Sequence, residues 1–193
     1  MNPRTGAIVL AAGFSTRFGG IKLCAKLANG KTVFSQTLQN IITAIPNSII
    51  VTRPEVAKLL SIKAGTDSSL HIFKGAESGM GSSLSYGIQQ IRDWDACLVC
   101  LADMPFILPS TYSTLASSLT SERIVIPNYR TKPGNPVGFG KKFFPELIAL
   151  TGDSGGKKIA FDNPAYLYEV AVNDSAILMD IDTPADLEKF SAS

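Results

Sequence analysis

The chain of 193 residues carries a formal net charge of +2, with 45% hydrophobic and 18% charged residues. This length and composition suffice for one substantial buried core and argue against disorder. The small net charge, without runs of like charge, argues against nucleic acid or a membrane surface as partner and favours small molecules. The sequence shows no signal-peptide core and no apolar stretch of membrane-spanning length, so we expect a cytoplasmic protein with a single domain over residues 1–193.

Short apolar runs alternate with segments of helical periodicity, which predicts an α/β fold with a mostly parallel sheet covered by helices on both faces. The last helix starts at a capping box made by Thr183 and Asp186 around Pro184. Helices are predicted over 32–45, 54–62, 81–92 and 183–191, with another starting near Pro109. Strands are predicted at Ala7–Leu10, Ser48–Thr52, Leu70–Phe73, Ala96–Leu101, Arg123–Pro127 and Ile177–Ile181.

The most informative stretch, residues 7–22, reads AIVLAAGFSTRFGGIK. Its three glycines let backbone N–H groups converge on an anion, and Arg17 and Lys22 supply positive charge. We therefore favour a phosphate-binding loop over an ordinary strand-to-helix turn with solvated basic residues. The loop is neither a Walker A motif nor a dinucleotide fingerprint, because Phe18 and Ser15 stand where those motifs require glycine.

Two aspartates follow predicted strands and are candidate magnesium ligands. Asp103 comes after the run ACLVCLA, and Asp182 comes after Ile177–Ile181. Ligands in open α/β sheets bind at the carboxyl ends of strands, where one or two carboxylates suit a magnesium ion held by a triphosphate. The alternatives are a turn or helix cap for Asp103 and helix-end electrostatics for Asp182. Strand alternation would direct Asp180 away from Asp182.

The glycine-rich turn GMGSSL over 79–84 opens the third predicted helix. Ser82 or Ser83 could hydrogen-bond the edge of a planar base, or a serine could simply cap the helix, and the sequence leaves both interpretations open.

The tract GDSGG over 152–156 matches the nucleophile motif of trypsin-like proteases, and His71, Asp103 and Ser154 occur in that family's order. Alternating strands and helices, a lone histidine in an apolar run and the absence of paired cysteines argue against a protease. We predict instead that the tract starts a helix at Lys157 and Lys158 that meets an acceptor's phosphate. The three cysteines, Cys24, Cys97 and Cys100, are predicted to be buried free thiols, not a metal or redox site.

The single histidine also removes the usual partners for serine, cysteine or zinc hydrolysis. A reaction that relies on cations and a metal ion fits better, and phosphoryl and nucleotidyl transfer are of this kind.

Six segments taken together resemble the molybdenum cofactor cytidylyltransferase family and its close nucleotidyltransferase relatives. The resemblance implies a three-layer α/β/α Rossmann-like nucleotidyltransferase fold. It also implies transfer of a nucleoside monophosphate from a triphosphate to an acceptor phosphate, with Mg²⁺ and release of pyrophosphate. The segments are LAAGFSTRFGGIK (10–22), GMGSSL (79–84), LADMPF (101–106), GNPVGF (134–139), GDSGGKK (152–158) and DIDTPADL (180–187).

By position, the resemblance assigns Lys22, Arg17 and Asp103 to catalysis and Asp103 and Asp182 to the metal. The implied nucleotide-binding residues are Leu10, Ala11, Ala12, Gly13, Ser15, Arg17, Lys22, Gly79, Ser83 and Asp103. The implied acceptor-binding residues are Asn135, Gly152, Asp153 and Lys157.

Ala12 resembles the cytidylyl members, whereas guanylyl relatives tend to have glycine there, so CTP is the expected donor. The family often has histidine where Asn135 stands, so a molybdopterin acceptor and a molybdoenzyme or its chaperone as partner remain family expectations. The alternatives are another triphosphate such as GTP, a sugar or polyol phosphate acceptor, or a nucleotide-binding or chaperone protein without turnover.

Overall fold

The computed structural model describes residues 4–60 and 68–191 and contains an eight-stranded sheet. The strand order is β3-β2-β1-β4-β7-β5-β6, with β8 paired to β5. Strand β1 (Thr5–Ala11) lies between β2 (Ser48–Thr52) and β4 (Ala96–Leu101) and is parallel to both, and β3 (Ser68–Ile72) extends this parallel half from β2. The predicted α/β fold with a mostly parallel sheet is confirmed.

The other half of the sheet mixes directions. Strand β7 (Val137–Gly140) is antiparallel to β4 and to β5 (Ile124–Tyr129), and β8 (Leu167–Ala171) is parallel to β5. The short β6 (Lys132–Pro133) forms a hairpin with β5. Neither β7 nor β8 was among the predicted strands.

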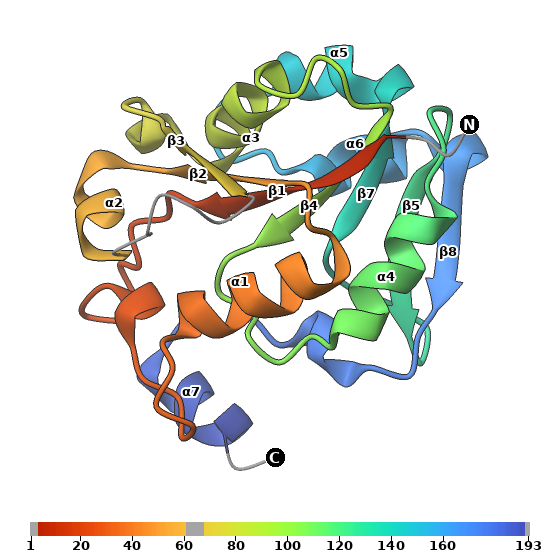
Figure 1. The fold of residues 1–193 in the computed structure, drawn as a ribbon. Helices are drawn as coiled ribbons and strands as arrows, with labels where there is room; N and C mark the ends of the chain where they lie inside the picture. Colours follow the sequence, from red (N-terminus) through yellow and green to blue (C-terminus); the bar gives the residue numbers. More distant parts are fainter. Residues whose placement is uncertain (1–3, 61–67, 192–193) are drawn as a thin grey trace.

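Helices cover both faces of the sheet (Figure 1). Ala7, Val9 and Ala11 of β1 face the core beneath α1 and α4, whereas Ile8 and Leu10 face the core beneath α3, α5 and α6. This alternation explains why β1 reads as one continuous apolar run: both of its faces are buried. The helices are α1 (Val33–Ala44), α2 (Pro54–Leu60), α3 (Met80–Gln89), α4 (Pro109–Ser118), α5 (Phe144–Ile148), α6 (Gly156–Asp162) and α7 (Pro184–Ser191).

The four predicted helices are present with shifted ends, and residues 61–62 of the predicted 54–62 helix lie outside the described residues. The capping box of α7 is confirmed: the backbone N–H of Thr183 donates to Oδ2 of Asp186 at 2.8 Å, and the N–H of Asp186 donates to Oγ1 of Thr183 at 3.2 Å.

The predicted strand at Ile177–Ile181 is wrong. A 3₁₀ helix spans Ser175–Leu178, and the chain then runs irregularly into α7. Asp174 holds the start of this segment in place: its carboxylate accepts hydrogen bonds from Ala176 N, from Leu108 N and from Oγ1 of Thr111. Ile177 and Ile181 are buried although this segment does not pair with the sheet, whereas Leu178 is exposed.

Cys97 and Cys100 are free thiols buried within β4, as predicted, and Cys24 is free but only partly buried. Burial raises the pKa of the Cys97 and Cys100 thiols well above the ordinary range. Among the described residues no helix combines the length and the apolarity that a membrane span requires.

Candidate active site

A pocket of 480 Å³ opens at the carboxyl ends of β1 and β4, and we call it the carboxyl-end pocket. The loop after β1, the start of α3, the end of β4 and the segment before α7 form its walls. Its lining includes the predicted residues Leu10, Ala11, Ala12, Gly13, Ser15, Arg17, Lys22, Gly79, Ser83, Asp103, Asp153 and Asp182. Phe14, Thr16, Leu23, Ala76, Met80, Leu101, Ala102 and Asp180, to which the sequence assigned no role, complete it.

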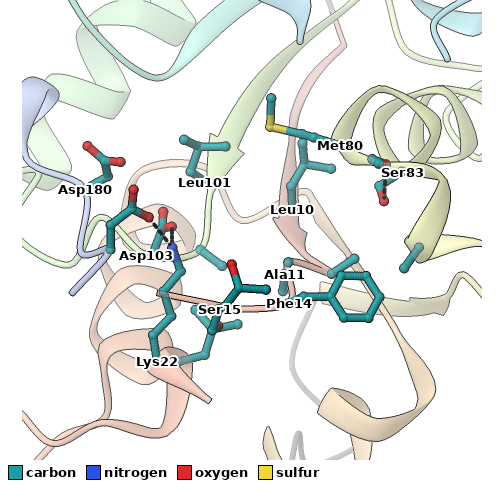
Figure 2. A pocket seen from close by; sticks show the side chains of 18 of the residues that line it. Leu10, Ala11, Phe14, Ser15, Lys22, Met80, Ser83, Leu101, Asp103 and Asp180 are labelled. Atoms are coloured by element: carbon teal, nitrogen blue, oxygen red, sulfur yellow. Dashed lines mark hydrogen bonds and ion pairs between the residues drawn. The ribbon is translucent and has the colours of Figure 1, made fainter. Parts of the chain in front are cut away.

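Lys22 lies at the centre of the charged end of this pocket (Figure 2). Its Nζ is 2.6 Å from Oδ2 of Asp103 and 2.8 Å from Oδ1 of Asp182. Arg17 joins the cluster through Nη2, which lies 2.9 Å from Oδ2 of Asp182. The Lys22 side chain is 12% exposed and that of Arg17 is 74% exposed, so Lys22 is the sheltered cation and Arg17 the solvated one.

Burial and neighbouring charges together set the pKa values of Lys22 and Asp103. Burial alone would lower the pKa of Lys22, but the charges and hydrogen bonds of Asp103 and Asp182 raise it overall, so the ammonium stays protonated. Burial raises the pKa of Asp103, the charge of Lys22 opposes this, and the nearby carboxylate of Asp180 adds to the rise. A further cation beside Asp103 would therefore favour its ionised form.

Backbone hydrogen bonds fix the two carboxylates relative to the sheet. Ala102 N donates to Leu10 O at 3.1 Å, which ties the end of β4 to the end of β1. Ile181 N donates to Asp103 O at 3.1 Å, and Asp182 N donates to the α7 capping carboxylate of Asp186 at 3.2 Å. The segment before α7 is thus attached directly to Asp103, although the two are far apart in sequence.

The carboxylates have the chemistry for a divalent cation. Oδ1 of Asp103 is buried and has no hydrogen-bond partner among the described residues, a costly state that a cation would relieve. Within the same part of the chain no group of three or more His, Cys, Asp or Glu side chains is arranged to hold a metal. A magnesium ion here would take its remaining ligands from phosphates and water, as this ion usually does.

Asp180 differs from its prediction. It lines the carboxyl-end pocket and acts electrostatically on Asp103, whereas strand alternation predicted that it points away. The reason is that Asp180 does not lie in a strand, so the alternation does not apply.

The opposite end of the pocket is lined mainly by uncharged residues, with the carboxylate of Asp153 beside Met80. Figure 2 shows Phe14, Met80 and Ser83 on the far side of Ala11 from Lys22. Neither serine caps α3: Gly79 is the N-cap residue, and Oγ of Ser83 donates to Gly79 O at 3.3 Å. Gly79 has a φ of 99°, a conformation that favours glycine.

The 152–156 tract packs against the start of α3. Gly81 N donates to Gly152 O at 2.8 Å, and Met80 N donates to Oδ1 of Asp153 at 3.4 Å. A Cβ on Gly79 would lie 2.4 Å from Gly152 O, so the absence of a side chain at Gly79 allows this approach. Asp153 consequently lines the carboxyl-end pocket, whereas Gly152 lines neither that pocket nor the cavity described next.

A second cavity of 330 Å³, which we call the Lys157 cavity, adjoins the first and shares Leu10, Met80 and Leu101 with it. Asn135 and Lys157 are brought together here, among mainly apolar side chains. Burial lowers the pKa of Lys157, and the charge of Asp180 partly offsets that effect. The remaining lining residues are Leu84, Val99, Val137, Phe139, Gly155, Gly156 and Lys158.

The protease-like order of His71, Asp103 and Ser154 has no counterpart in space. His71 lies on the edge strand β3, where its Nε2 is 3.0 Å from Oγ of Ser69, and it lines a separate cavity with Arg4 and Trp94. Asp103 lies at the other end of the sheet, in the carboxyl-end pocket. A Ser-His-Asp triad is therefore excluded.

Two similar proteins span nearly the whole chain. Purine catabolism protein PucB of Bacillus subtilis (strain 168) is 28% identical over 198 residues, which cover 97% of this chain and 96% of PucB. The crystal structure of Rv0371c from Mycobacterium tuberculosis H37Rv superposes with a TM-score of 0.86 at 24% identity, covering 100% of both chains. Its manganese complex gives a TM-score of 0.83 at 22% identity, with 98% of this chain and 99% of that chain covered.

Molybdopterin-guanine dinucleotide biosynthesis protein A of Archaeoglobus fulgidus shares the fold at a TM-score of 0.68 and 19% identity, with 97% of each chain covered. The model of the MobA-like NTP transferase domain matches residues 7–165, which include the glycine-rich loop, Asp103 and Lys157. The chain belongs to this family of nucleotidyltransferases.

Proposed function

We propose that this nucleotidyltransferase transfers CMP from CTP to the phosphate of an acceptor that carries a fused ring system, such as molybdopterin, and releases pyrophosphate. The observation that carries the proposal is Lys22 held between Asp103 and Asp182, beneath a glycine-rich loop and beside a second, partly apolar cavity.

In this proposal the triphosphate lies along the loop after β1. Lys22 and Arg17 exchange their contacts with Asp103 and Asp182 for phosphate oxygens, and the loop backbone at Gly13 approaches the phosphates. The base lies at the opposite end of the pocket, near Ala11, Gly79 and Ser83. Ala12 lines the same pocket, and its methyl group leaves less room than a glycine would, which favours the smaller pyrimidine and hence CTP over GTP.

Asp103 and Asp182 would hold Mg²⁺, which neutralises phosphate charge when it is bound. Support comes from the buried, unpartnered Oδ1 of Asp103 and from the manganese complex of Rv0371c.

The acceptor occupies the Lys157 cavity in this proposal. Its apolar lining suits a ring system better than a sugar or polyol, whose hydroxyls would lose hydrogen bonds there. Lys157 is half-buried and offers an ammonium to the acceptor phosphate, and Asn135 can hydrogen-bond ring substituents. Gly152 and Asp153, expected to bind the acceptor, do not line the Lys157 cavity and contact Gly81 and Met80 at the start of α3.

The reaction needs no strong protein base, because a phosphate monoester is already ionised at neutral pH. A phosphate oxygen of the acceptor attacks the α-phosphorus, the bond from that phosphorus to the bridging oxygen of the β-phosphate breaks, and pyrophosphate leaves. Lys22 and Arg17 stabilise the negative charge that develops. The shared wall of Leu10, Met80 and Leu101 sets where the two substrates meet.

The test is pyrophosphate release with CTP, GTP, ATP or UTP and Mg²⁺, with molybdopterin or a sugar phosphate as acceptor. We expect release with CTP and molybdopterin, lost in Lys22→Ala and Asp103→Ala variants that keep wild-type circular dichroism. Tight nucleotide binding without release with any acceptor would indicate a binding protein instead. Near-normal rates in both variants would overturn the proposed site.

A further inference from the structure

Phe14 is an aromatic side chain that the loop after β1 leaves in the carboxyl-end pocket. Its side chain is 48% exposed, and it lines the pocket at the end opposite Lys22 and Asp103 (Figure 2). An exposed phenylalanine gains little from the hydrophobic core, so its place in a polar loop calls for another role.

Arg53 lies over the ring of Phe14. Its Cζ is 4.4 Å from the ring centroid, although its side chain is only 13% exposed. Its Nη1 is 3.2 Å from Oε2 of Glu55, and its buried Nε has no hydrogen-bond partner in the described part of the chain. The position of the Arg53 guanidinium therefore satisfies its contact with the Phe14 ring but leaves one of its own buried N–H donors without an acceptor.

The strand ends set the position of this pair. Arg53 directly follows β2, and Phe14 follows β1 after a short loop. Oγ1 of Thr52 donates to Ala11 O at 3.0 Å within the parallel pairing of Ala11 with Thr52. The backbone next to Arg53 is thereby held against the backbone that leads into Phe14. The Arg53 guanidinium, which lies over the ring, limits the conformations that the Phe14 side chain can adopt.

We propose that Phe14 is the stacking platform for the base of the bound nucleotide and that Arg53 is the residue that positions it. This inference rests on the proposed function, which places phosphates at Lys22 and hence the base at the opposite end of the pocket, beside Phe14. A planar base gains from the face of an aromatic ring, and a ring already held in place loses little freedom on binding. Every base has such a face, so Phe14 supplies affinity without selecting the base.

The first experiment compares two ligands, CTP and inorganic tripolyphosphate, each with Ca²⁺ in place of Mg²⁺ to limit turnover. For Phe14→Ala we expect about tenfold or more weaker binding of CTP by isothermal titration calorimetry, because stacking on an aromatic side chain contributes about 1–3 kcal/mol per base. Tripolyphosphate, which has no base, should bind as it does to the wild type. Phe14→Trp should retain CTP affinity.

The second experiment isolates Arg53. We expect Arg53→Met to weaken CTP binding in the wild-type background but not in the Phe14→Ala background, since a positioning residue acts only through its ring. The matched control is the pair Arg123 and Tyr168, whose Cζ-to-centroid distance is 4.7 Å and neither of which lines the carboxyl-end pocket. Arg123→Met and Tyr168→Ala should leave CTP affinity unchanged.

The outcomes separate this inference from the function on which it rests. If Phe14→Ala binds CTP as tightly as the wild type, or loses CTP and tripolyphosphate equally, the stacking role is wrong while nucleotide binding stands. If the wild-type protein binds tripolyphosphate but no nucleoside triphosphate, or binds neither ligand, the proposed function fails and the inference with it.

Discussion

A single ammonium, that of Lys22, bridges the two carboxylates Asp103 and Asp182 at 2.6 and 2.8 Å. The three side chains come from the start of a 3₁₀ helix, the end of β4 and the segment before α7, so this contact joins three parts of the fold at one point. The cation occupies the position next to the carboxylates that a divalent metal ion would need. Metal and lysine therefore compete, and a nucleotide that draws Lys22 towards its phosphates favours the metal.

The first prediction concerns metal affinity without nucleotide. Lys22→Met removes the ammonium but keeps most of the side-chain volume, leaving two carboxylates close together without a cation. We expect Mn²⁺ to bind this variant at least about tenfold more tightly than it binds the wild type. Removing a unit charge about 4 Å from a cation relieves about 4 kcal/mol of repulsion at a partly buried site, and about 1.4 kcal/mol already corresponds to tenfold. Mn²⁺ binding measured by electron paramagnetic resonance tests this.

The variant should also melt at a lower temperature than the wild type without metal and regain more stability on addition of Mn²⁺. Lys26→Met is the matched control, since Nζ of Lys26 donates to Gly30 O at 3.1 Å at an exposed site. Weaker Mn²⁺ binding by Lys22→Met than by the wild type would show that the lysine does not compete with the metal.

The second prediction contrasts two glycines of the site. Gly79 has a φ of 99°, and a Cβ there would lie 2.4 Å from Gly152 O, so Gly79→Ala should lower the free energy of unfolding. We expect a loss of about 2 kcal/mol, or about 4–8 °C in Tm. A Cβ on Gly13 would meet no atom within 4 Å, so Gly13→Ala should keep the wild-type Tm.

Gly13→Ala should nevertheless weaken nucleotide binding, because in the proposed function its backbone approaches the phosphates. Thermal melts paired with calorimetric titration of CTP separate the two effects. An equal fall in Tm for both variants would contradict the assignment of Gly13 to ligand binding.

The sequence predicted the parallel half of the sheet because its strands are buried on both faces and read as continuous apolar runs. Strand β7 was missed, since its sequence VGFG is half glycine. Those glycines are needed there: a Cβ on Gly138 would lie 2.8 Å from Leu119, and one on Gly140 would lie 2.4 Å from Ser121 O. Strand β8 was missed because it pairs only with β5 and exposes Tyr168 and Glu169, so its pattern is mixed.

The charged residues of the site could be predicted from the sequence because the carboxyl ends of parallel strands meet at one edge of the sheet. Lys22, Asp103 and Asp182 were assigned to that edge and do lie in contact. Asp180 was misjudged because the apolar run before it was taken for a strand. Phe14 could not have been singled out, since its place depends on Arg53, which only the pairing of β1 with β2 brings beside it.

The third prediction concerns thiol reactivity. The thiolate is the reactive form, and burial raises the pKa of Cys97 and Cys100, so both remain protonated and shielded at pH 8. Only Cys24, which is partly exposed, should react with Ellman's reagent in the native protein, and all 3 cysteines should react in guanidinium chloride. A Cys24→Ser variant should show no rapid reaction, and rapid reaction of the native variant would mean that β4 opens readily.

The fourth prediction is a pH dependence of stability at the α7 cap. Hydrogen bonds from Thr183 and the Asp182 backbone hold the pKa of Asp186 below its ordinary value of 3.8. A depressed pKa gives stability that is present above the ordinary value and is lost as the pH falls through the folded-state value. Asp186→Asn should therefore be less stable than the wild type in urea at pH 7, and the difference should shrink near pH 3. Glu188→Gln, at an exposed position of the same helix, should show neither effect. If the difference in stability between the wild type and Asp186→Asn were the same at both pH values, the charge of Asp186 would not stabilise the cap.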